Sequence, residues 1–387
     1  MIGAEAPALS LADRARAVSQ VAAAAAEAVD RAARFPAEAF DEARQGRLLS
    51  ALIPSGLGGE GASFADVADS VRIIAHGCAS SGLIYAMHQI QVACLVRHGD
   101  NDVLRDALRR VCDEQLLLAS ATSEVNVGGD VRTSVCAVEP AETGFTLQKA
   151  APVISYGEQA DAVLATARRT PDSPPSDQVL VYLPAGPDLT LERSGEWDTL
   201  GFRGTCSLGF RLQGRGQPDQ ILTSAYGDIS AQTMLPVSHI LWASVWLGLA
   251  ESAAAKAHTY LRAAARKSPD RPLAAARRTA ELSASLQELR GLIRAAVALF
   301  TAHEHDGDAL GSVSFAISMN SLKVSASTLV VDIVAAAMGI CGMSGYRHDS
   351  PFTLGRHLRD AYGAALMINN DRILDNTAQL LLVSKEI

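Results

Sequence analysis

The residue composition and the spacing of apolar residues change twice along the sequence. The order of the three resulting regions restricts the fold more than any single motif. Residues 1–118 and 229–387 are rich in Ala, Leu, Arg and Glu, with apolar positions three or four residues apart, which is typical of amphipathic helices. Residues 119–228 instead contain short alternating or β-branched segments between Gly, Pro, Asp and Ser, which is typical of antiparallel strands. We therefore expect an α+β protein with an N-terminal helical domain, a central antiparallel β domain and a C-terminal four-helix bundle.

Composition excludes several classes of function. Of the 387 residues, 48% are hydrophobic and 20% are charged, as in globular proteins with a large core. The net charge of −8 and the lack of a Lys/Arg stripe argue against a nucleic-acid partner. The sequence contains no run of about 18 apolar residues without a charge, so we expect no membrane-spanning segment. The six cysteines form no CxxC pair, which favours reduced thiols in the cytoplasm over disulfides or zinc.

Two further segments are interpreted without a special function. The Ala-rich start of the chain carries charges throughout and predicts an amphipathic helix rather than a signal peptide. His303 and His305 lie two residues apart in TAHEHDGD and point to different sides of a helix, so they predict a polar helix end and no metal site.

Three motifs carry a resemblance to a known family. They are IPSGLGGEG at 53–61 before a predicted helix, WDTLGFRGTCS at 197–207, and MGICGMSGYRHDSPFTLGRHLRDA at 338–361. Together with the domain order, they resemble the acyl-CoA dehydrogenase superfamily over nearly the whole chain. The resemblance implies FAD bound between the β domain and the C-terminal bundle, in a homotetramer or homodimer.

The resemblance also implies cofactor contacts. ATSEVNVGGDV at 121–131 resembles the family's polar flavin loop, and in APVISYG Ser155 takes the place of a Thr that faces the flavin, with Val153 in place of a Trp. Hydroxyls and glycine backbone are suited to a flavin ring. A plain turn or an incidental serine would explain the same segments. The implied ring contacts are Thr122, Ser123, Gly128, Gly129 and Ser155.

The phosphates and adenosine of FAD are assigned to other residues. Gly342 and Gly345 suit left-handed backbone positions and leave room for a neighbouring subunit's cofactor. Arg262 and Arg266 flank the family's pyrophosphate arginine, a role that bidentate guanidinium groups fill. A helix stop and solvated arginines remain the structural alternatives.

Substrate contacts are expected from all three domains. SGLIYAMHQIQ at 81–91 is expected to line the acyl end of the cavity, although core packing explains its apolar face equally well. Arg203 is expected on a strand edge near the cofactor with Thr205 and Ser207. The first bundle helix, where some family members keep their base, begins here without a carboxylate. The candidate substrate contacts are Tyr85, His88, Arg203, Ser238 and His239.

The catalytic base of the family has no direct counterpart. Dehydrogenation of an acyl thioester requires a group that accepts the α-proton, usually a Glu just before the final helix. Here the segment after Arg359-Asp360 is longer, and alignment nominates Asp371, beside Arg372, or Asp375. Both aspartates also suit a helix start, where Asn370 or Asp371 would be a good cap.

These assignments predict an FAD-dependent oxidoreductase that dehydrogenates an acyl thioester and passes electrons to an electron-transfer flavoprotein, with Asp371 as the preferred base. The missing Glu also fits a two-component flavin-dependent monooxygenase supplied by a flavin reductase. However, the His that several such enzymes carry after the Arg-Asp pair is missing from RDAYGAALM. A catalytically silent binding protein is the third alternative.

Overall fold

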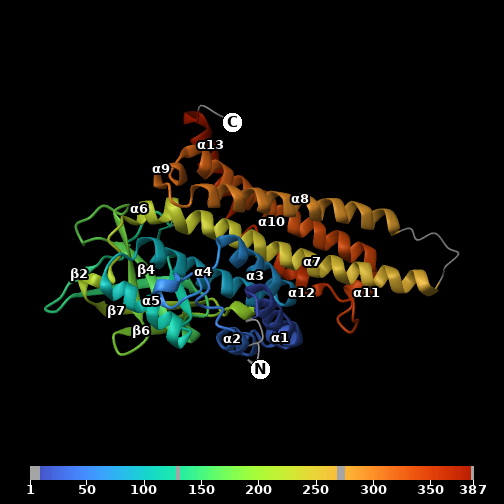
Figure 1. Cartoon of the computed structure of the whole chain (residues 1–387), viewed down its shortest axis with the longest axis horizontal. Coiled ribbons are helices and arrows are strands. Elements are labelled where there is room, and N and C mark those ends of the chain that lie inside the picture. The colour runs from blue at the N-terminus through green and yellow to red at the C-terminus, as the bar shows by residue number, and fades with distance from the viewer. Residues whose placement is uncertain (1–8, 128–130, 268–274, 385–387) are drawn as a thin grey trace, which may run out of the picture.

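Polar side chains cap the N-terminal helices. The computed structural model describes residues 9–127, 131–267 and 275–384. Ser10, Ser63 and Asn101 each accept a hydrogen bond from the backbone N–H three residues further on, at 3.2, 3.1 and 2.9 Å, which satisfies donors that a helix start leaves free. The helical N-terminal domain is therefore confirmed (Figure 1), and its helices are α1 (Leu11–Ala32), α2 (Ala37–Gln45), α3 (Phe64–Gly77), α4 (Ala79–His98) and α5 (Asp102–Glu114).

The central domain consists of two small sheets. Their strand orders are β1-β4-β5 and β2-β3-β7-β6. The strands are β1 (Leu118–Ala121), β2 (Glu139–Pro140), β3 (Phe145–Ile154), β4 (Ala162–Arg168), β5 (Gln178–Pro184), β6 (Leu189–Gly195) and β7 (Leu208–Gly216).

One strand pair departs from the predicted antiparallel domain. β1 pairs with β4 in parallel, with Leu118 opposite Ala162, whereas the other strand neighbours in the two sheets are antiparallel. A parallel pair requires a long crossover, and here the chain leaves the first sheet after β1 and passes through β2 and β3 of the second sheet before β4. Local alternation does not reveal such a crossover.

Long helices form the C-terminal region, as predicted. A continuous helix runs from Tyr226 to Lys267, through α6 (Tyr226–Ile229), a π-helical turn at Ser230–Met234 and α7 (Leu235–Lys267). It packs beside α8 and α10 (Figure 1), while α12 and α13 complete the region. The remaining elements are α8 (Ala276–His303), α9 (Gly307–Leu310), α10 (Val313–Cys341), α11 (Met343–Tyr346), α12 (Gly355–Gly363) and α13 (Asn370–Val383).

Two of these helices are apolar and long enough to cross a membrane by length and composition alone. In the first, Tyr226–Lys267, 89% of the most apolar window is buried inside the protein, as expected of a core helix. In Val313–Cys341 only 44% is buried, and the exposed residues of α10 are small or polar: Ser314, Ser318, Ser321, Thr328, Asp332, Ala335, Ala336 and Gly339.

Glycines allow three helices to approach closely. A Cβ added to Gly82 of α4 would lie 2.5 Å from the Cβ of Ala75 on α3, and one added to Gly248 of α7 would lie 2.2 Å from the carbonyl oxygen of Arg72. Helix α3 therefore packs directly on the backbone of α4 and α7.

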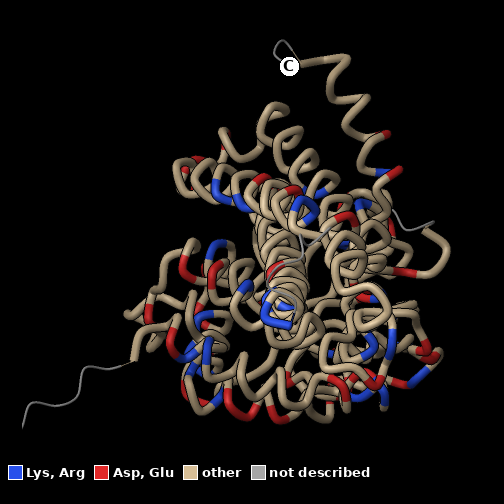
Figure 2. Tube along the Cα trace, turned by 90° about the vertical axis from the view of Figure 1, so that its right-hand side faces the viewer, with Lys and Arg blue, Asp and Glu red and all other residues tan. Residues whose placement is uncertain are grey.

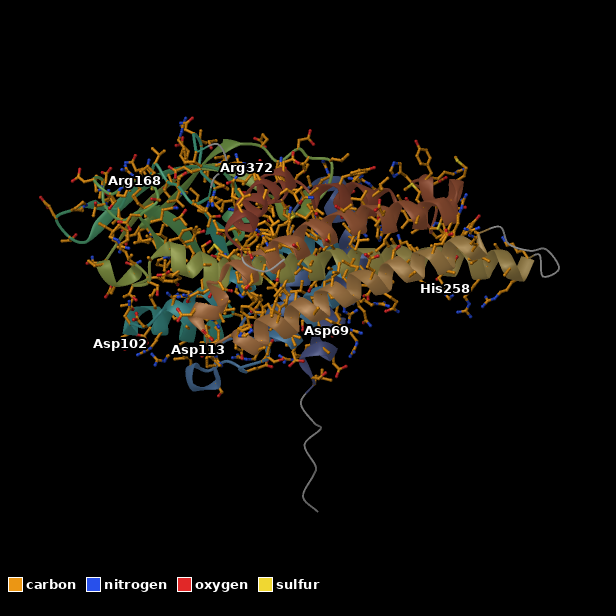
Figure 3. All side chains as sticks on the ribbon, turned by 90° about the horizontal axis from the view of Figure 1, so that it is seen from above. Asp69, Asp102, Asp113, Arg168, His258 and Arg372 are labelled. Atoms are coloured by element: carbon orange, nitrogen blue, oxygen red, sulfur yellow. The ribbon has the colours of Figure 1, made fainter. Side chains whose placement is uncertain are left out.

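The molecule is elongated. The β domain, with Arg168 of β4, lies at one end, and the outer turns of α7, with His258, project at the other (Figure 3). Acidic and basic residues alternate along much of the backbone trace (Figure 2).

Candidate active site

A cavity of about 520 Å³ lies where the three domains meet. Its walls are mostly apolar and come from α4, the end of β3, the 197–207 loop, α7 and the segment around α12. Its lining residues are Leu83, Met87, Val153, Ser155, Trp197, Thr199, Leu200, Gly201, Phe202, Thr205, Ser207, Trp242, Arg359, Tyr362, Gly363, Leu366, Met367 and Ile368.

Three hydroxyl groups form a row on the β-domain side of the cavity. The Oγ atom of Ser207 lies 2.7 Å from Oγ of Ser155 and 2.8 Å from Oγ1 of Thr205. The Thr205 hydroxyl also lies 2.9 Å from the carbonyl oxygen of Phe202, to which it can donate. Ser155, Thr205 and Ser207 thus all line the cavity, and contact of Ser155 with a flavin stays a prediction.

The 197–203 loop is held in a tight conformation. The indole N–H of Trp197 donates to the carbonyl oxygen of Phe202 at 3.1 Å, and Phe202 itself has a positive φ of 50°. A Cβ on Gly201 would lie 2.2 Å from the carbonyl oxygen of Arg359, so only glycine fits against α12 there. This loop brings β-domain residues to the rim of the cavity.

Arg203 does not lie on a strand edge, contrary to the prediction. Residues Arg203–Thr205 form a 3₁₀ turn. The Arg203 guanidinium donates to the carbonyl oxygen of Asp30 at 2.9 Å and forms an ion pair with Asp198 at 2.9 Å. Its side chain is directed toward α1 and does not line the cavity, so in this structure it links two domains.

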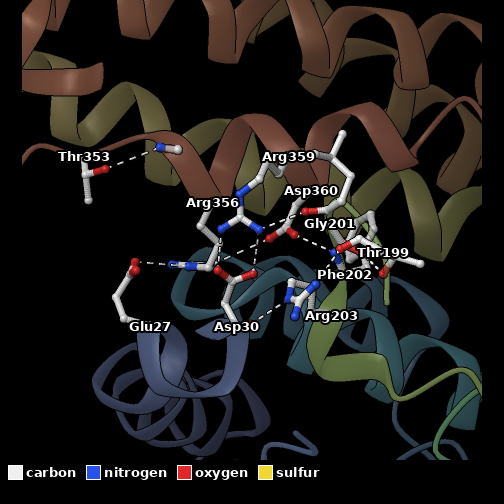
Figure 4. A network of polar contacts seen from close by, with 12 residues as sticks. Glu27, Asp30, Thr199, Gly201, Phe202, Arg203, Thr353, Arg356, Arg359 and Asp360 are labelled. Atoms are coloured by element: carbon white, nitrogen blue, oxygen red, sulfur yellow. Dashed lines mark hydrogen bonds and ion pairs between the residues drawn. The ribbon is translucent and has the colours of Figure 1, made fainter. Parts of the chain in front are cut away.

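A polar network at the cavity rim ties α1, the 197–203 loop and α12 together (Figure 4). The Arg359 guanidinium binds the Asp30 carboxylate and donates to the carbonyl oxygen of Leu200 at 2.8 Å. The Asp360 carboxylate accepts the N–H of Phe202 at 2.7 Å. Burial raises the pKa of Asp360 to about 6, although the nearby Arg356 guanidinium acts in the opposite direction.

Helices supply the facing wall. Trp242 of α7 lines the cavity, and its indole N–H is buried without a hydrogen-bond partner in the part of the chain that the structure describes. A buried N–H without a partner is costly. Because this N–H is itself buried and not exposed to the cavity, Trp242 contributes its ring to the wall and no donor to a ligand.

The predicted substrate contacts on α4 are turned away from the cavity. The Tyr85 hydroxyl donates to the carbonyl oxygen of Leu48 at 3.3 Å. His88 lies 2.7 Å from the carbonyl oxygen of Leu49, and burial lowers its pKa to about 4. Leu83 and Met87 of the same helix line the cavity instead. Because α4 is buried on nearly all sides, its sequence does not reveal which face meets the cavity.

Ser238 and His239 also lie in the core of the protein and outside the cavity lining. The Ser238 hydroxyl donates to the carbonyl oxygen of Met234, and Nδ1 of His239 lies 3.0 Å from the carbonyl oxygen of Met319 on α10. Burial lowers the pKa of His239 to about 4, so its ring is neutral near pH 7. Trp242, one turn further along α7, is the residue of this segment that lines the cavity.

The two candidate bases lie on the outer surface of α13. Asp371 and Asp375 are both exposed, and neither lines the cavity. The helix cap is Asn369, which accepts the N–H of Asp371 at 2.8 Å, and not Asn370 or Asp371 as expected. Among the described residues that line the cavity there is no Asp, Glu or His.

The predicted flavin loop lies beside the cavity. The Ser123 hydroxyl donates to the carbonyl oxygen of Val153 at 3.0 Å, whereas Thr122 contributes its carbonyl oxygen to a 3.5 Å contact with Thr166. Gly128 and Gly129 lie outside the described residues.

Sequence reasoning missed the group that anchors this loop. The buried Glu124 carboxylate accepts hydrogen bonds from the Ser134 hydroxyl at 2.6 Å, the Cys136 N–H at 2.7 Å and the buried Lys149 ammonium at 3.1 Å. Its partners lie 10, 12 and 25 residues further along the chain, so no local pattern in the sequence reveals them.

The residues assigned to the distal part of FAD do not line the cavity. Arg262 and Arg266 are exposed on the outer turns of α7. Gly342 has the expected positive φ, at 57°, after α10. Gly345 does not, because it belongs to the short helix α11, where its position opposite Cys341 leaves only 2.8 Å for a Cβ.

The cavity fits a flavin ring. Such a ring needs hydrogen-bond donors at one polar edge and apolar contacts on its faces. The hydroxyls of Ser155, Thr205 and Ser207 supply the polar groups, and aliphatic and aromatic side chains supply the rest.

Comparison with known proteins agrees with this fit. Residues 8–115 match the model of the acyl-CoA dehydrogenase N-terminal domain, and residues 227–367 match that of its C-terminal domain. The chain is 24% identical over 325 residues to a dibenzothiophene monooxygenase of Mycolicibacterium goodii, covering 79% of this chain and 78% of the relative. It is 26% identical over 336 residues to the mitochondrial short-chain specific acyl-CoA dehydrogenase of Bos taurus, covering 85% and 78%.

Solved structures share the whole fold. FMN-bound TdsC from Paenibacillus sp. A11-2 superposes with a TM-score of 0.84 at 20% identity and covers 96% of this chain and 97% of its own. A nitrososynthase from Micromonospora carbonacea var. africana gives 0.83 at 21% identity, with 98% of both chains covered. The chain belongs to the acyl-CoA dehydrogenase family of flavin-dependent oxidoreductases.

Proposed function

We propose that the protein is a flavin-dependent monooxygenase that oxygenates a small, uncharged, apolar molecule. The observation that carries this proposal is the absence of a carboxylate or imidazole from the described cavity lining. Dehydrogenation of a thioester needs a base within hydrogen-bond reach of the α-proton, and the nominated bases Asp371 and Asp375 are exposed on α13.

The charge of the cavity supports an uncharged substrate. Arg359 is the charged residue among the described lining residues, and its guanidinium is already bound to Asp30 and to the carbonyl oxygen of Leu200. The apolar side chains of Leu83, Met87 and Trp242 line the cavity beside it. Walls of this kind favour an aliphatic or aromatic body and exclude water from the reaction.

The residues around the cavity divide the work. Ser155 and Ser207 would hold the polar edge of the flavin, and the network of Arg359 and Asp360 fixes the loop that carries Ser207. When bound in its reduced form, the flavin supplies the two electrons that reduce one oxygen atom of O₂ to water while the other enters the substrate. The cofactor is FMN or FAD, and a flavin reductase is the proposed partner.

A thioester dehydrogenase is the second candidate. It is favoured by the similarity to the bovine short-chain specific acyl-CoA dehydrogenase over 85% of the chain. In that case the cofactor is FAD and the electron partner is an electron-transfer flavoprotein. A cytoplasmic location stays a prediction for either function.

One experiment separates the two candidates. The protein is mixed anaerobically with chemically reduced FMN and with indole or dibenzothiophene as probes, and buffer saturated with ¹⁸O₂ is then added. We expect mass spectrometry to find a product that carries one ¹⁸O atom. No labelled product from either probe, together with bleaching of oxidised flavin by butyryl-CoA in a separate oxygen-free sample of the protein, would overturn the proposal.

Variants of α13 test the same point. We expect Asp371→Asn and Asp375→Asn to oxygenate the probes at the wild-type rate, as should Arg372→Gln, a matched control on the same exposed turn (Figure 3). A general base contributes about 10²–10⁴-fold to a rate. A loss of that size in Asp371→Asn alone, measured as bleaching by butyryl-CoA, would instead support the dehydrogenase.

A further inference from the structure

Three polar side chains of α10 hold the last part of the chain. Asn320, Lys323 and Ser327 are buried, and their spacing of three and four residues places them on one face of the helix. This face packs against α13, which leads away from the body of the molecule (Figure 2). We call these three residues the C-terminal clasp.

Lys323 is the central member of the clasp. Its ammonium donates to the carbonyl oxygen of Ile368 at 2.6 Å and to Oδ1 of Asn370 at 2.7 Å. Its side chain is fully buried beside the ring of Trp246, at 5.9 Å, and within the described residues no ion pair joins it to a carboxylate. Burial of this kind lowers the pKa of Lys323 to about 8. A buried ammonium without a counter-ion is unfavourable, so packing alone does not account for a lysine here.

The other two members contact different parts of α13. The Ser327 hydroxyl accepts from the Asn370 amide at 3.0 Å, next to the Lys323 contact. Asn320 donates to the Thr377 hydroxyl at 3.0 Å, further along α13. Lys323 and Ser327 therefore hold the start of α13, while Asn320 holds its middle.

The carbonyl group that Lys323 binds belongs to a strained residue of the cavity wall. Ile368 has a φ of 51°, a conformation that a β-branched residue rarely adopts and that persists only where its surroundings impose it. Leu366, Met367 and Ile368 all line the cavity, and Leu366 and Ile368 are 73% and 40% exposed. Backbone hydrogen bonds from Leu366 and Met367 to the carbonyl oxygen of Gly363 hold the same segment on its other side.

We propose that Lys323 is a positioning residue that sets the shape of the apolar cavity wall by holding the backbone of Ile368 from behind. Lys323 does not line the cavity, so it acts on the substrate through residues 366–368. The inference rests on the proposed function only in taking this wall to face the substrate.

Amide hydrogen exchange tests whether Lys323 holds the backbone of residues 366–368, and it needs no substrate or turnover. The N–H groups of Met367 and Asn370 are hydrogen-bonded to Gly363 and Ala365, so their exchange reports opening of the wall. In the full-length Lys323→Met variant we expect peptides covering 364–373 to exchange about ten- to hundredfold faster, as loss of a charge-assisted hydrogen bond implies. Peptides from β3 and β7 should keep the wild-type rate. Equal rates in variant and wild type would overturn the proposal.

Matched variants separate positioning from general loosening. Asn320→Leu removes a contact from the same face of α10 but leaves Ile368 bound, so the 364–373 peptides should keep their wild-type exchange. If Lys323→Met does not fold, Asn370→Ala removes the half-exposed partner and should accelerate the same peptides. Acceleration by Asn320→Leu equal to that by Lys323→Met would contradict a specific role of Lys323.

Turnover of indole with reduced FMN supplies a second measurement. Because Lys323 shapes the wall and does not touch reacting atoms, Lys323→Met should raise KM by about tenfold while kcat stays within about threefold, since only binding interactions are lost. A fall in kcat at unchanged KM would overturn the inference. If the wild-type protein oxygenates neither probe, the proposed function fails, and the exchange comparison still decides whether Lys323 holds the wall.

Discussion

At the scale of single residues, the hydroxyl row is the part of the cavity most directly tied to a flavin. Ser155→Ala and Ser207→Ala each remove one hydroxyl from the row. We expect each to weaken FMN binding by about tenfold, since a hydrogen bond is worth roughly 1–1.5 kcal/mol. Quenching of FMN fluorescence gives the dissociation constants. Ser176→Ala, at an exposed position before β5, is the control and should bind as the wild type. Wild-type affinity in both hydroxyl variants would place the ring elsewhere.

The buried carboxyl group of Asp360, at the cavity rim, makes the stability of the protein depend on pH. Burial raises its pKa to about 6, above the value of about 3.9 in unfolded chains. The folded state therefore binds the proton more tightly, and this group lowers stability as pH rises from about 4 to 6, with the full cost present above 6. Asp360→Asn keeps an acceptor for the Phe202 N–H and removes this cost.

The expected difference is measurable by urea unfolding. The free energy of unfolding of Asp360→Asn relative to the wild type should rise by about 2–3 kcal/mol between pH 4 and 6 and stay constant above that, because one pKa unit corresponds to about 1.4 kcal/mol. Asp360→Ala is the contrasting variant, since it leaves the Phe202 N–H without its acceptor and Arg356 paired with Glu27 alone. A pH-independent difference for Asp360→Asn would show that the wild-type carboxyl titrates normally.

At the scale of elements, helix packing rests on glycine contacts. In Gly248→Ala the new Cβ would lie 2.2 Å from the carbonyl oxygen of Arg72, so α3 and α7 must separate. We expect a loss of roughly 2–3 kcal/mol in the free energy of unfolding, as for other overpacked sites. Gly291→Ala on α8 is the matched control, because no atom lies within 4 Å of the added Cβ. It should stabilise the protein by about 0.5–1 kcal/mol.

Chemical denaturation of both glycine variants checks this prediction. If Gly248→Ala is as stable as Gly291→Ala, the helices are not in the close contact described for α3 and α7.

Elements with strong periodicity and local signals could be predicted from the sequence. The long helices, the positive φ of Gly342 and the cavity position of Ser155 follow from apolar spacing, a Gly-rich helix end and a motif. The rotation of a helix that is buried on all sides could not be predicted, because apolar residues then occupy every face and their spacing marks none of them. Hence Tyr85 and His88 were assigned to a cavity that Leu83 and Met87 line.

Contacts between segments that are distant along the chain could not be predicted from the sequence either. The turn of Arg203 toward Asp30 and the parallel pairing of β1 depend on how α1 and the second sheet are placed, and neither leaves a local pattern. The same holds for Lys323, whose neighbours in sequence suggest an ordinary surface lysine while its partners lie beyond residue 367.

At the scale of the whole molecule, the outer face of α10 carries few charged side chains. Helix α10 carries Lys323 and Asp332 as its charged residues, and Lys323 is buried. Ala335 and Ala336 are exposed on its outer face, and Met343 and Tyr346, just beyond its end, are each 68% exposed. Exposed apolar surface marks protein contacts where it is contiguous, and Asp332, which is also exposed, lies three residues before Ala335 on the same face.

A homodimer or homotetramer is therefore the last prediction, with α10 in its interface. The 40.6 kDa chain should elute with light-scattering masses of two or four copies at micromolar concentration. Ala335→Arg places a charge on this face and should shift the mass toward one copy, because an unpaired buried charge opposes association. Gly291→Arg, an exposed position on α8, is the control for added charge. A single-copy mass for the wild type, or equal masses for both arginine variants, would contradict an interface on α10.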